Sequence, residues 1–225
     1  MLQKHTSQNG VRIVSEHIPH VRSVAVGVWV HAGSRHEKPE QNGLTHFIEH
    51  MLFKGTATRT ARQIAEEFDR IGGHVNAFTS KEYTCYYAKV LDHHAKHAVS
   101  VLADMFFHSQ FDDQELDKER QVVLEEISMV EDTPDDDVHE QLWNVMYPNQ
   151  SIGASILGTK ETLSTFTPDM IHQFMDHNYR PEQIVISVAG NIPEGFIAHI
   201  DELFGQFSPT TPTIEKTIFE PAVFF

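Results

Sequence analysis

Alternating apolar and polar residues predict strands at both ends of the chain and around residue 80. Residues 4–18 hold two short runs separated by an Asn9-Gly10 turn, and the valine-rich run SVAVGVWVHAGS follows at residues 23–34. Two further alternating runs, HVNAFTS and EYTCYYAKVL, flank Ser80-Lys81 and predict a second hairpin. A last strand is predicted at QIVISVAGNI, close to the end of the chain.

Elsewhere, apolar residues recur at the three- and four-residue spacing of amphipathic helices. One such pattern begins directly after Gly43, at Leu44, Phe47, Ile48, Met51 and Leu52. Further helices are predicted at residues 60–73, 92–108, 112–130, 134–146, 167–179 and 193–207. This order of strands and helices predicts an α+β fold with one mixed, mostly antiparallel sheet packed with helices. Residues 209–225 are rich in proline and threonine, which predicts a linker or an extended arm.

Composition and charge narrow the classes of function. The formal net charge of −15 disfavours nucleic acid and anionic lipid as partners, and it tolerates basic ligands such as positively charged peptides. No apolar run is long enough to span a membrane, and the start of the chain lacks the apolar core of a secretory signal. Cys85 is the single cysteine, which favours a reducing compartment and predicts a cytoplasmic location.

The stretch GLTHFIEHMLFKGT, at residues 43–56, carries two histidines and a glutamate within five positions. His46 and His50 are four residues apart, so a helix places both imidazoles on one face, where they can hold one ion. Glu49 lies beside that face and can take a proton from a water that the metal activates. The stretch therefore predicts a Zn²⁺ site with Glu49 as the general base.

A catalytic zinc needs a third protein ligand. The helix predicted at residues 112–130 offers four glutamates, Glu115, Glu119, Glu125 and Glu126. Glu126 flanks the apolar face of this helix, and Glu119 shares its side of the helix, whereas Glu125 points more outward. A carboxylate beside an apolar face is costly unless it is paired or binds a cation, which favours Glu126 with Glu125 as the alternative.

Three segments taken together resemble one protein family. His46-Phe47-Ile48-Glu49-His50 with MLFKGT, then GGHVNAFTSKEYTCYYAKV, then LDKERQVVLEEISMVED, are similar to segments of the inverted-motif zinc peptidases and occur in the same order. The family is that of pitrilysin, insulin-degrading enzyme and the β-subunit of mitochondrial processing peptidase. The bacterial processing-protease-like members resemble this chain most, over most of residues 1–210.

The resemblance implies a processing-peptidase-like metallohydrolase half in residues 1–208, which acts as a zinc-dependent endopeptidase on extended peptides or presequence-like segments. It implies three zinc ligands, His46, His50 and Glu126. Glu49 becomes the general base, and Glu119 supports the site through a hydrogen bond to a ligating histidine. Asn76 and Ala77 match an edge strand that pairs with the backbone of a peptide or unfolded polypeptide substrate.

Length departs from the family pattern. Members of this type carry two homologous halves, and the second half usually supplies an arginine and a tyrosine near the scissile bond. This chain resembles only the first half. The resemblance therefore implies a homologous second half or partner subunit, and a dimer, with residues 209–225 as the start of a linker. The chain alone is expected to bind metal but to cleave peptides poorly.

Two other functions are compatible with this His-x-x-Glu-His motif. A non-catalytic subunit of the same family would hold extended peptides or serve as a structural component. A small-molecule lyase of the S-ribosylhomocysteinase kind also carries a zinc and a His-x-x-x-His arrangement, but it normally has a reactive cysteine, and Cys85 is a poor candidate. The stretches DHHAKH and EDTPDDD contain potential ligands, yet their spacing predicts solvated helix starts rather than metal sites.

Overall fold

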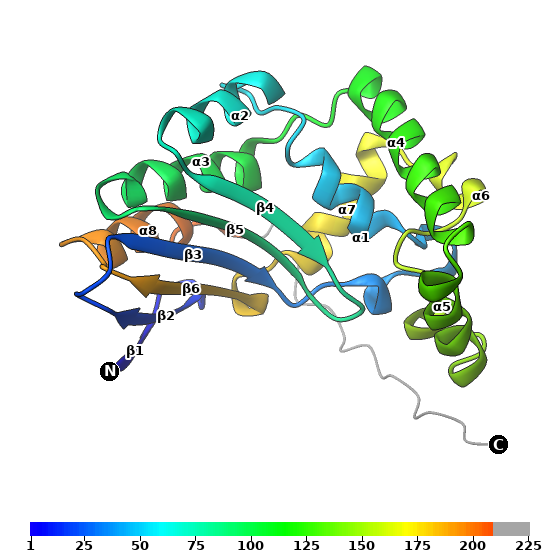
Figure 1. Cartoon of the computed structure of the whole chain (residues 1–225), viewed down its shortest axis with the longest axis horizontal. Coiled ribbons are helices and arrows are strands. Elements are labelled where there is room, and N and C mark those ends of the chain that lie inside the picture. Colours follow the sequence, from blue (N-terminus) through cyan, green and yellow to red (C-terminus); the bar gives the residue numbers. More distant parts are fainter. Residues whose placement is uncertain (209–225) are drawn as a thin grey trace.

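A six-stranded sheet with the strand order β1-β2-β6-β3-β5-β4 forms the framework of the molecule (Figure 1). The strands are β1 Leu2–Thr6, β2 Arg12–His17, β3 Ser23–Val30, β4 His74–Thr79, β5 Thr84–Leu91 and β6 Ile184–Gly190. Neighbouring strands are antiparallel except β2 and β6, which run parallel. The structure is a computed structural model that describes residues 1–208, so the arm predicted at residues 209–225 lies outside the described part.

One face of the sheet is buried under helices. Alternate valines of β3, from Val24 to Val30, are at most 1% exposed, because successive side chains of a strand point to opposite faces. Trp29 points to the other face, where its ring contacts those of Phe78 and Tyr83. The sheet therefore has a helical side, which holds the core, and an open side lined by aromatic rings.

The helices fill the long connections between strands. They are α1 Leu44–Met51, α2 Ala61–Arg70, α3 Ala95–His108, α4 Asp113–Glu131, α5 Pro134–Met146, α6 Lys160–Leu163, α7 Pro168–Asn178 and α8 Phe196–Phe204. Helix α3 packs on β5 and α8, whereas α1 lies between the edge strand β4 and helix α4 (Figure 1). Within residues 1–208, no helix has the length and apolar character needed to cross a bilayer.

The predicted α+β fold with a mixed, mostly antiparallel sheet is confirmed. Three details differ from the predicted helices, and one of them is that α8, predicted at residues 193–207, spans only Phe196–Phe204. Helix α3 begins at Ala95 rather than near residue 92, because Asp92–His94 form a 3-10 turn. The four-residue helix α6 was not predicted, because four residues are too few to show a helical period.

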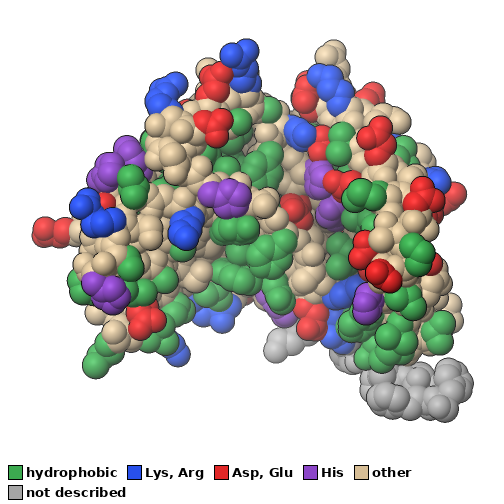
Figure 2. All heavy atoms as spheres, in the orientation of Figure 1, with side chains coloured by type: hydrophobic (Ala, Val, Ile, Leu, Met, Phe, Trp, Pro, Cys, Tyr) green, Lys and Arg blue, Asp and Glu red, His purple; other side chains and the backbone are tan. Residues whose placement is uncertain are grey.

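Helix α5 turns its apolar side toward solvent. Three residues spaced four and three apart are each more than half exposed: Val138 at 58%, Leu142 at 53% and Val145 at 71%. The opposite side carries Glu140 and Trp143, and both contact Lys81. The Lys81 Nζ lies 3.7 Å from Glu140 Oε2 and 5.8 Å from the centroid of the Trp143 ring. Hydrophobic side chains gather over α5 at the lower right of Figure 2. The packing of this helix is therefore the reverse of a normal surface helix.

Candidate metal centre

Helix α1 carries the predicted His-x-x-Glu-His stretch and is fixed by its apolar stripe. Four of its side chains are buried against the core: Leu44, Phe47, Ile48 and Met51. Thr45 is buried as well, whereas His46, Glu49 and His50 are only partly buried and lie off this stripe. Burial of the stripe thus sets the direction in which the three polar side chains point.

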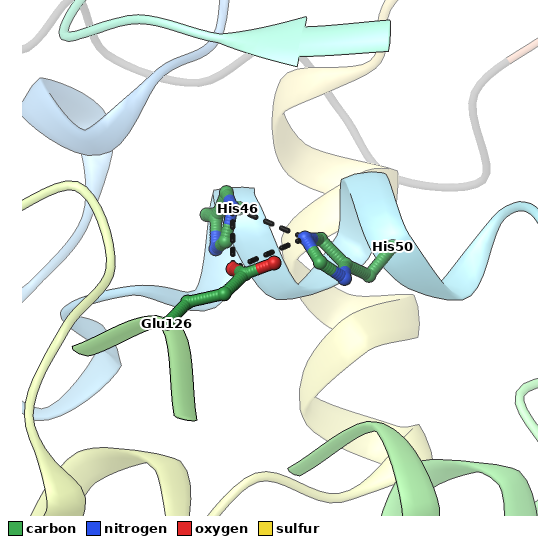
Figure 3. Close-up of side chains that lie close together, drawn as sticks. All are labelled: His46, His50 and Glu126. Atoms are coloured by element: carbon green, nitrogen blue, oxygen red, sulfur yellow. Dashed lines mark hydrogen bonds and ion pairs between the residues drawn. The ribbon is translucent and has the colours of Figure 1, made fainter. Parts of the chain in front are cut away.

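His46, His50 and Glu126 converge on one point between α1 and α4 (Figure 3). The Nε2 atoms of the two histidines are 3.2 Å apart, and Glu126 Oε2 lies 3.7 Å from His46 Nε2 and 3.6 Å from His50 Nε2. Within residues 1–208, this is the group of three His, Cys, Asp or Glu side chains whose ligand atoms meet closely enough for one ion. The structure thus brings together the three ligands expected from the resemblance.

The separations fit a zinc ion. Ligand atoms about 2.0–2.2 Å from a tetrahedral zinc lie roughly 3.3–3.5 Å from one another, close to the three separations observed here. Two imidazole nitrogens and one carboxylate oxygen are also a donor set that Zn²⁺ accepts. A cation between these three atoms would explain why two nitrogens and an oxygen face one another so closely.

His50 is held in a defined tautomer by Glu119. Its Nδ1 lies 2.7 Å from Glu119 Oε1, and a carboxylate only accepts, so the Nδ1–H donates and, in the neutral ring, Nε2 presents its lone pair to the centre. Burial favours neutral Glu119, but hydrogen bonds from His50 and Lys54 outweigh it and lower the Glu119 pKa. Lys54 also forms an ion pair with Glu119 Oε2, so the negative charge of this buried carboxylate is balanced by a positive one.

His46 is kept neutral by its surroundings. Burial, together with the nearby His50, lowers the pKa of His46 to about 3, so the imidazole carries no charge near neutral pH. A neutral imidazole is the form that binds a metal. Unlike His50, the buried Nδ1 of His46 has no hydrogen-bond partner within the described chain.

Glu49 lies between the centre and the edge strand. Its Oε2 accepts a hydrogen bond of 2.6 Å from the hydroxyl of Thr79, the last residue of β4. Burial raises the Glu49 pKa, and this hydrogen bond opposes the shift. A carboxylate with a raised pKa is a stronger base than an exposed one, which suits proton transfer.

The free edge of β4 runs beside α1. Ser80 N–H bonds to Tyr83 C=O at the hairpin end, so alternation along the ladder leaves the N–H of Ala77 on the free edge. Asn76 is exposed, and its Oδ1 accepts that N–H at 2.9 Å. The two predicted substrate-binding residues therefore lie on the edge strand, where Asn76 is exposed, Ala77 is 9% exposed, and the Asn76 side chain covers the Ala77 N–H.

The register of α4 separates the two alternative third ligands. Glu126 points to the histidines, whereas Glu125 is exposed and is absent from the group. Thr79 and Lys54 also contact site residues, and sequence reasoning missed both. Lys54 follows the end of α1 in MLFKGT and pairs with Glu119 on α4, so its contact depends on tertiary packing and no local spacing signals it.

Comparison with known proteins places the sequence and the fold in one peptidase family. Residues 12–160 match the family described as Insulinase (Peptidase family M16). The chain is 62% identical over 207 residues to an uncharacterized zinc protease, YmxG, of Bacillus subtilis, covering 92% of this chain and 51% of that protein. It is 40% identical over 222 residues to a probable mitochondrial-processing peptidase subunit beta of Arabidopsis thaliana, covering 97% and 42%.

Solved structures share the fold. A protease from Helicobacter pylori superposes with a TM-score of 0.92 at 22% identity, over 99% of this chain and 54% of that one. A domain from Pseudomonas fluorescens, described as a peptidase M16 inactive domain, gives 0.89 at 17% identity, also over 99% and 54%. The chain belongs to the insulinase family of peptidases, family M16, and spans about half the length of the curated relatives that it matches.

Glu119→Gln tests the support given to His50. The amide keeps the size of the side chain but removes the charge that Lys54 and the His50 Nδ1–H share. Affinity for zinc is expected to fall about 10- to 100-fold, the usual effect of losing a hydrogen bond to a ligating histidine. Competition with a chromogenic chelator measures this change, and an unchanged affinity would limit the role of Glu119 to its ion pair with Lys54.

Proposed function

We propose that this chain is the metal-binding half of a zinc-dependent endopeptidase that acts on extended peptides or presequence-like segments. The observation that carries the proposal is the convergence of His46 Nε2, His50 Nε2 and Glu126 Oε2 beside a buried glutamate. Membership of a peptidase family whose relatives include named zinc proteases supports the choice of reaction and metal.

His46, His50 and Glu126 would hold the ion. Zinc in such a site acidifies a water molecule and polarises the carbonyl of a peptide bond. Glu49 accepts the proton of that water and later donates it to the leaving amine. Thr79 orients Glu49 through the hydrogen bond to Oε2, and Glu119 orients His50 through Nδ1.

The edge strand β4 would bind the substrate backbone by adding a strand to the sheet. Ala77 offers its N–H on the free edge, and a pairing peptide must take this donor over from Asn76 Oδ1. Thr79, on the same strand, contacts Glu49, so a peptide aligned on β4 would pass close to the general base. The acid surplus of the chain favours substrates that carry basic residues.

A homologous second half or partner subunit would complete the enzyme. The protease from Helicobacter pylori is about twice as long as the aligned part, and so is the separately solved first half of a periplasmic protease from Escherichia coli, whose whole chain is about four times as long. The outward apolar side of α5 would suit contact with another unit. We propose that such units act as a dimer, in the reducing cytoplasm that the single Cys85 favours.

Metal analysis combined with a peptide assay tests the function. We expect one zinc per chain after equilibration, and slow cleavage of a quenched fluorogenic peptide that is abolished by a chelator and restored by zinc. Zinc binding without any cleavage would favour the alternative, a non-catalytic peptide-binding or structural subunit. A chain that binds no zinc would overturn both the metal centre and the peptidase activity.

A further inference from the structure

Glu37 is a buried carboxylate in the loop that leads into helix α1. Its side chain belongs to a residue that is only 5% exposed. Oε2 accepts the N–H of Gly43 at 2.8 Å, and Oε1 accepts the N–H of Thr45 at 2.7 Å. Both oxygens are therefore used on the first turn of the helix that carries His46 and His50.

This cap cannot come from the helix itself. The residue at the N-cap position is Gly43, which has no side chain and adopts a φ of 92°. A Cβ there would lie 2.6 Å from Leu157 O and 2.7 Å from Gly158 Cα, so a serine or aspartate does not fit. The N–H groups of the first turn need an acceptor in any helix, and here Glu37 supplies it from six residues upstream.

The groups that contact Glu37 favour its carboxylate form, whereas burial disfavours it. Its close partners are backbone N–H groups, and the N-terminus of a helix carries partial positive charge. Asn42 Nδ2 lies 3.4 Å from Glu37 Oε2 and donates at 2.8 Å to Ser155 O, which ties the cap to a distant loop. Burial raises the Glu37 pKa to about 7, and the hydrogen bonds from Thr45, Gly43 and Asn42 oppose this shift.

The first turn of α1 matters because it contains His46. His50 is oriented by Glu119, but the Nδ1 of His46 has no hydrogen-bond partner among residues 1–208. Apart from the contacts of its Nε2 with His50 and Glu126, the position of the His46 ring therefore depends on the backbone of the first turn and on packing. A turn that frays would move His46 away from His50 while His50 stayed in place.

We propose that Glu37 is a positioning residue for the metal centre, which anchors the first turn of α1 and thereby sets the position of His46. This inference rests on the proposed zinc site. Glu37 touches neither the metal ligands nor the general base in the described contacts, so it acts through the helix backbone.

Glu37→Gln tests the role, with Glu40→Gln as the matched control. The substituted amide side chain would offer one acceptor oxygen and one NH₂ group, so only one of the two N–H groups keeps its partner. Glu40 is exposed in the same loop and makes no contact with α1 in the described hydrogen bonds. Both variants are compared with the wild type at pH 8, above the Glu37 pKa of about 7.

Two readouts separate positioning from general stability. Zinc affinity, measured by chelator competition, is expected to fall about tenfold in E37Q and to stay unchanged in E40Q. Hydrogen exchange of the metal-free protein is expected to speed up at the amides of Thr45–Phe47, with the exchange in β5 and α4 unchanged. Faster exchange over the whole chain would overturn the positioning role in favour of a general one.

The outcomes also distinguish this inference from the proposed function. A wild-type chain that binds no zinc overturns the proposed function and the inference with it. Zinc bound by E37Q at the wild-type affinity overturns the role of Glu37 alone. If E37Q does not fold, Glu37→Asp serves instead, because its shorter carboxylate keeps the charge but cannot reach both N–H groups, and an affinity equal to wild type again overturns the role.

Discussion

Glu49→Gln is expected to retain zinc and to lose peptide cleavage by about 10²- to 10⁴-fold, the usual contribution of a general base. The amide can still accept the hydrogen bond from Thr79, so the side chain should keep its place beside the centre. It cannot take a proton from water at neutral pH, which removes the proposed transfer to the leaving amine. The measurement is the cleavage rate of a fluorogenic peptide per bound zinc.

Glu66→Gln provides the control for this experiment, because Glu66 is exposed on α2 and pairs only with Arg62 in the described ion pairs. Its rate and zinc content should match the wild type. Undiminished turnover in the Glu49 variant would remove Glu49 from the mechanism. Loss of zinc together with activity would instead make Glu49 part of the metal-binding set.

Removing Glu126 should have the largest effect on metal binding. Glu126→Gln replaces the carboxylate that lies 3.6 Å and 3.7 Å from the two histidine nitrogens by a neutral amide. Zinc affinity is expected to drop more than about 100-fold, because a ligand contributes more than the groups that merely support it. Isothermal titration with zinc, or chelator competition, measures the loss.

The neighbouring glutamate gives a close control. Glu125→Gln makes the same chemical change one position away, on the exposed side of α4, and should bind zinc like the wild type. Stoichiometric zinc of wild-type affinity in the Glu126 variant would exclude Glu126 as a ligand. A loss confined to the Glu125 variant would show that α4 has the other register in solution.

Helical periodicity in the sequence was enough to predict helix α1 and the side of the helix on which the candidate ligands lie. The stripe of Leu44, Phe47, Ile48 and Met51 identified α1, and the same helix geometry placed His46 and His50 on one side. The apolar face of α4 also favoured Glu126 over Glu125, and the structure has Glu126 beside the histidines. These inferences succeed because a helix repeats every 3.6 residues, so neighbours on its surface follow from sequence distance alone.

Contacts that depend on tertiary packing were not predictable in this way. The parallel pairing of β2 with β6 joins residues about 170 positions apart, and no local pattern encodes it. Glu37 looks like one more charge in a polar loop until the fold brings the Leu157–Gly158 backbone against Gly43. Thr79 likewise reaches Glu49 only because the end of β4 lies beside α1.

Because α5 exposes an apolar side, the high negative charge also affects whether copies of the chain associate. With a net charge of −15 near neutral pH, separate copies of this half repel one another despite exposed Val138, Leu142 and Val145. This repulsion between copies disappears near the isoelectric point of about 5.4, where the exposed apolar residues of α5 are expected to promote self-association. The net negative charge thus opposes self-association through this exposed apolar side.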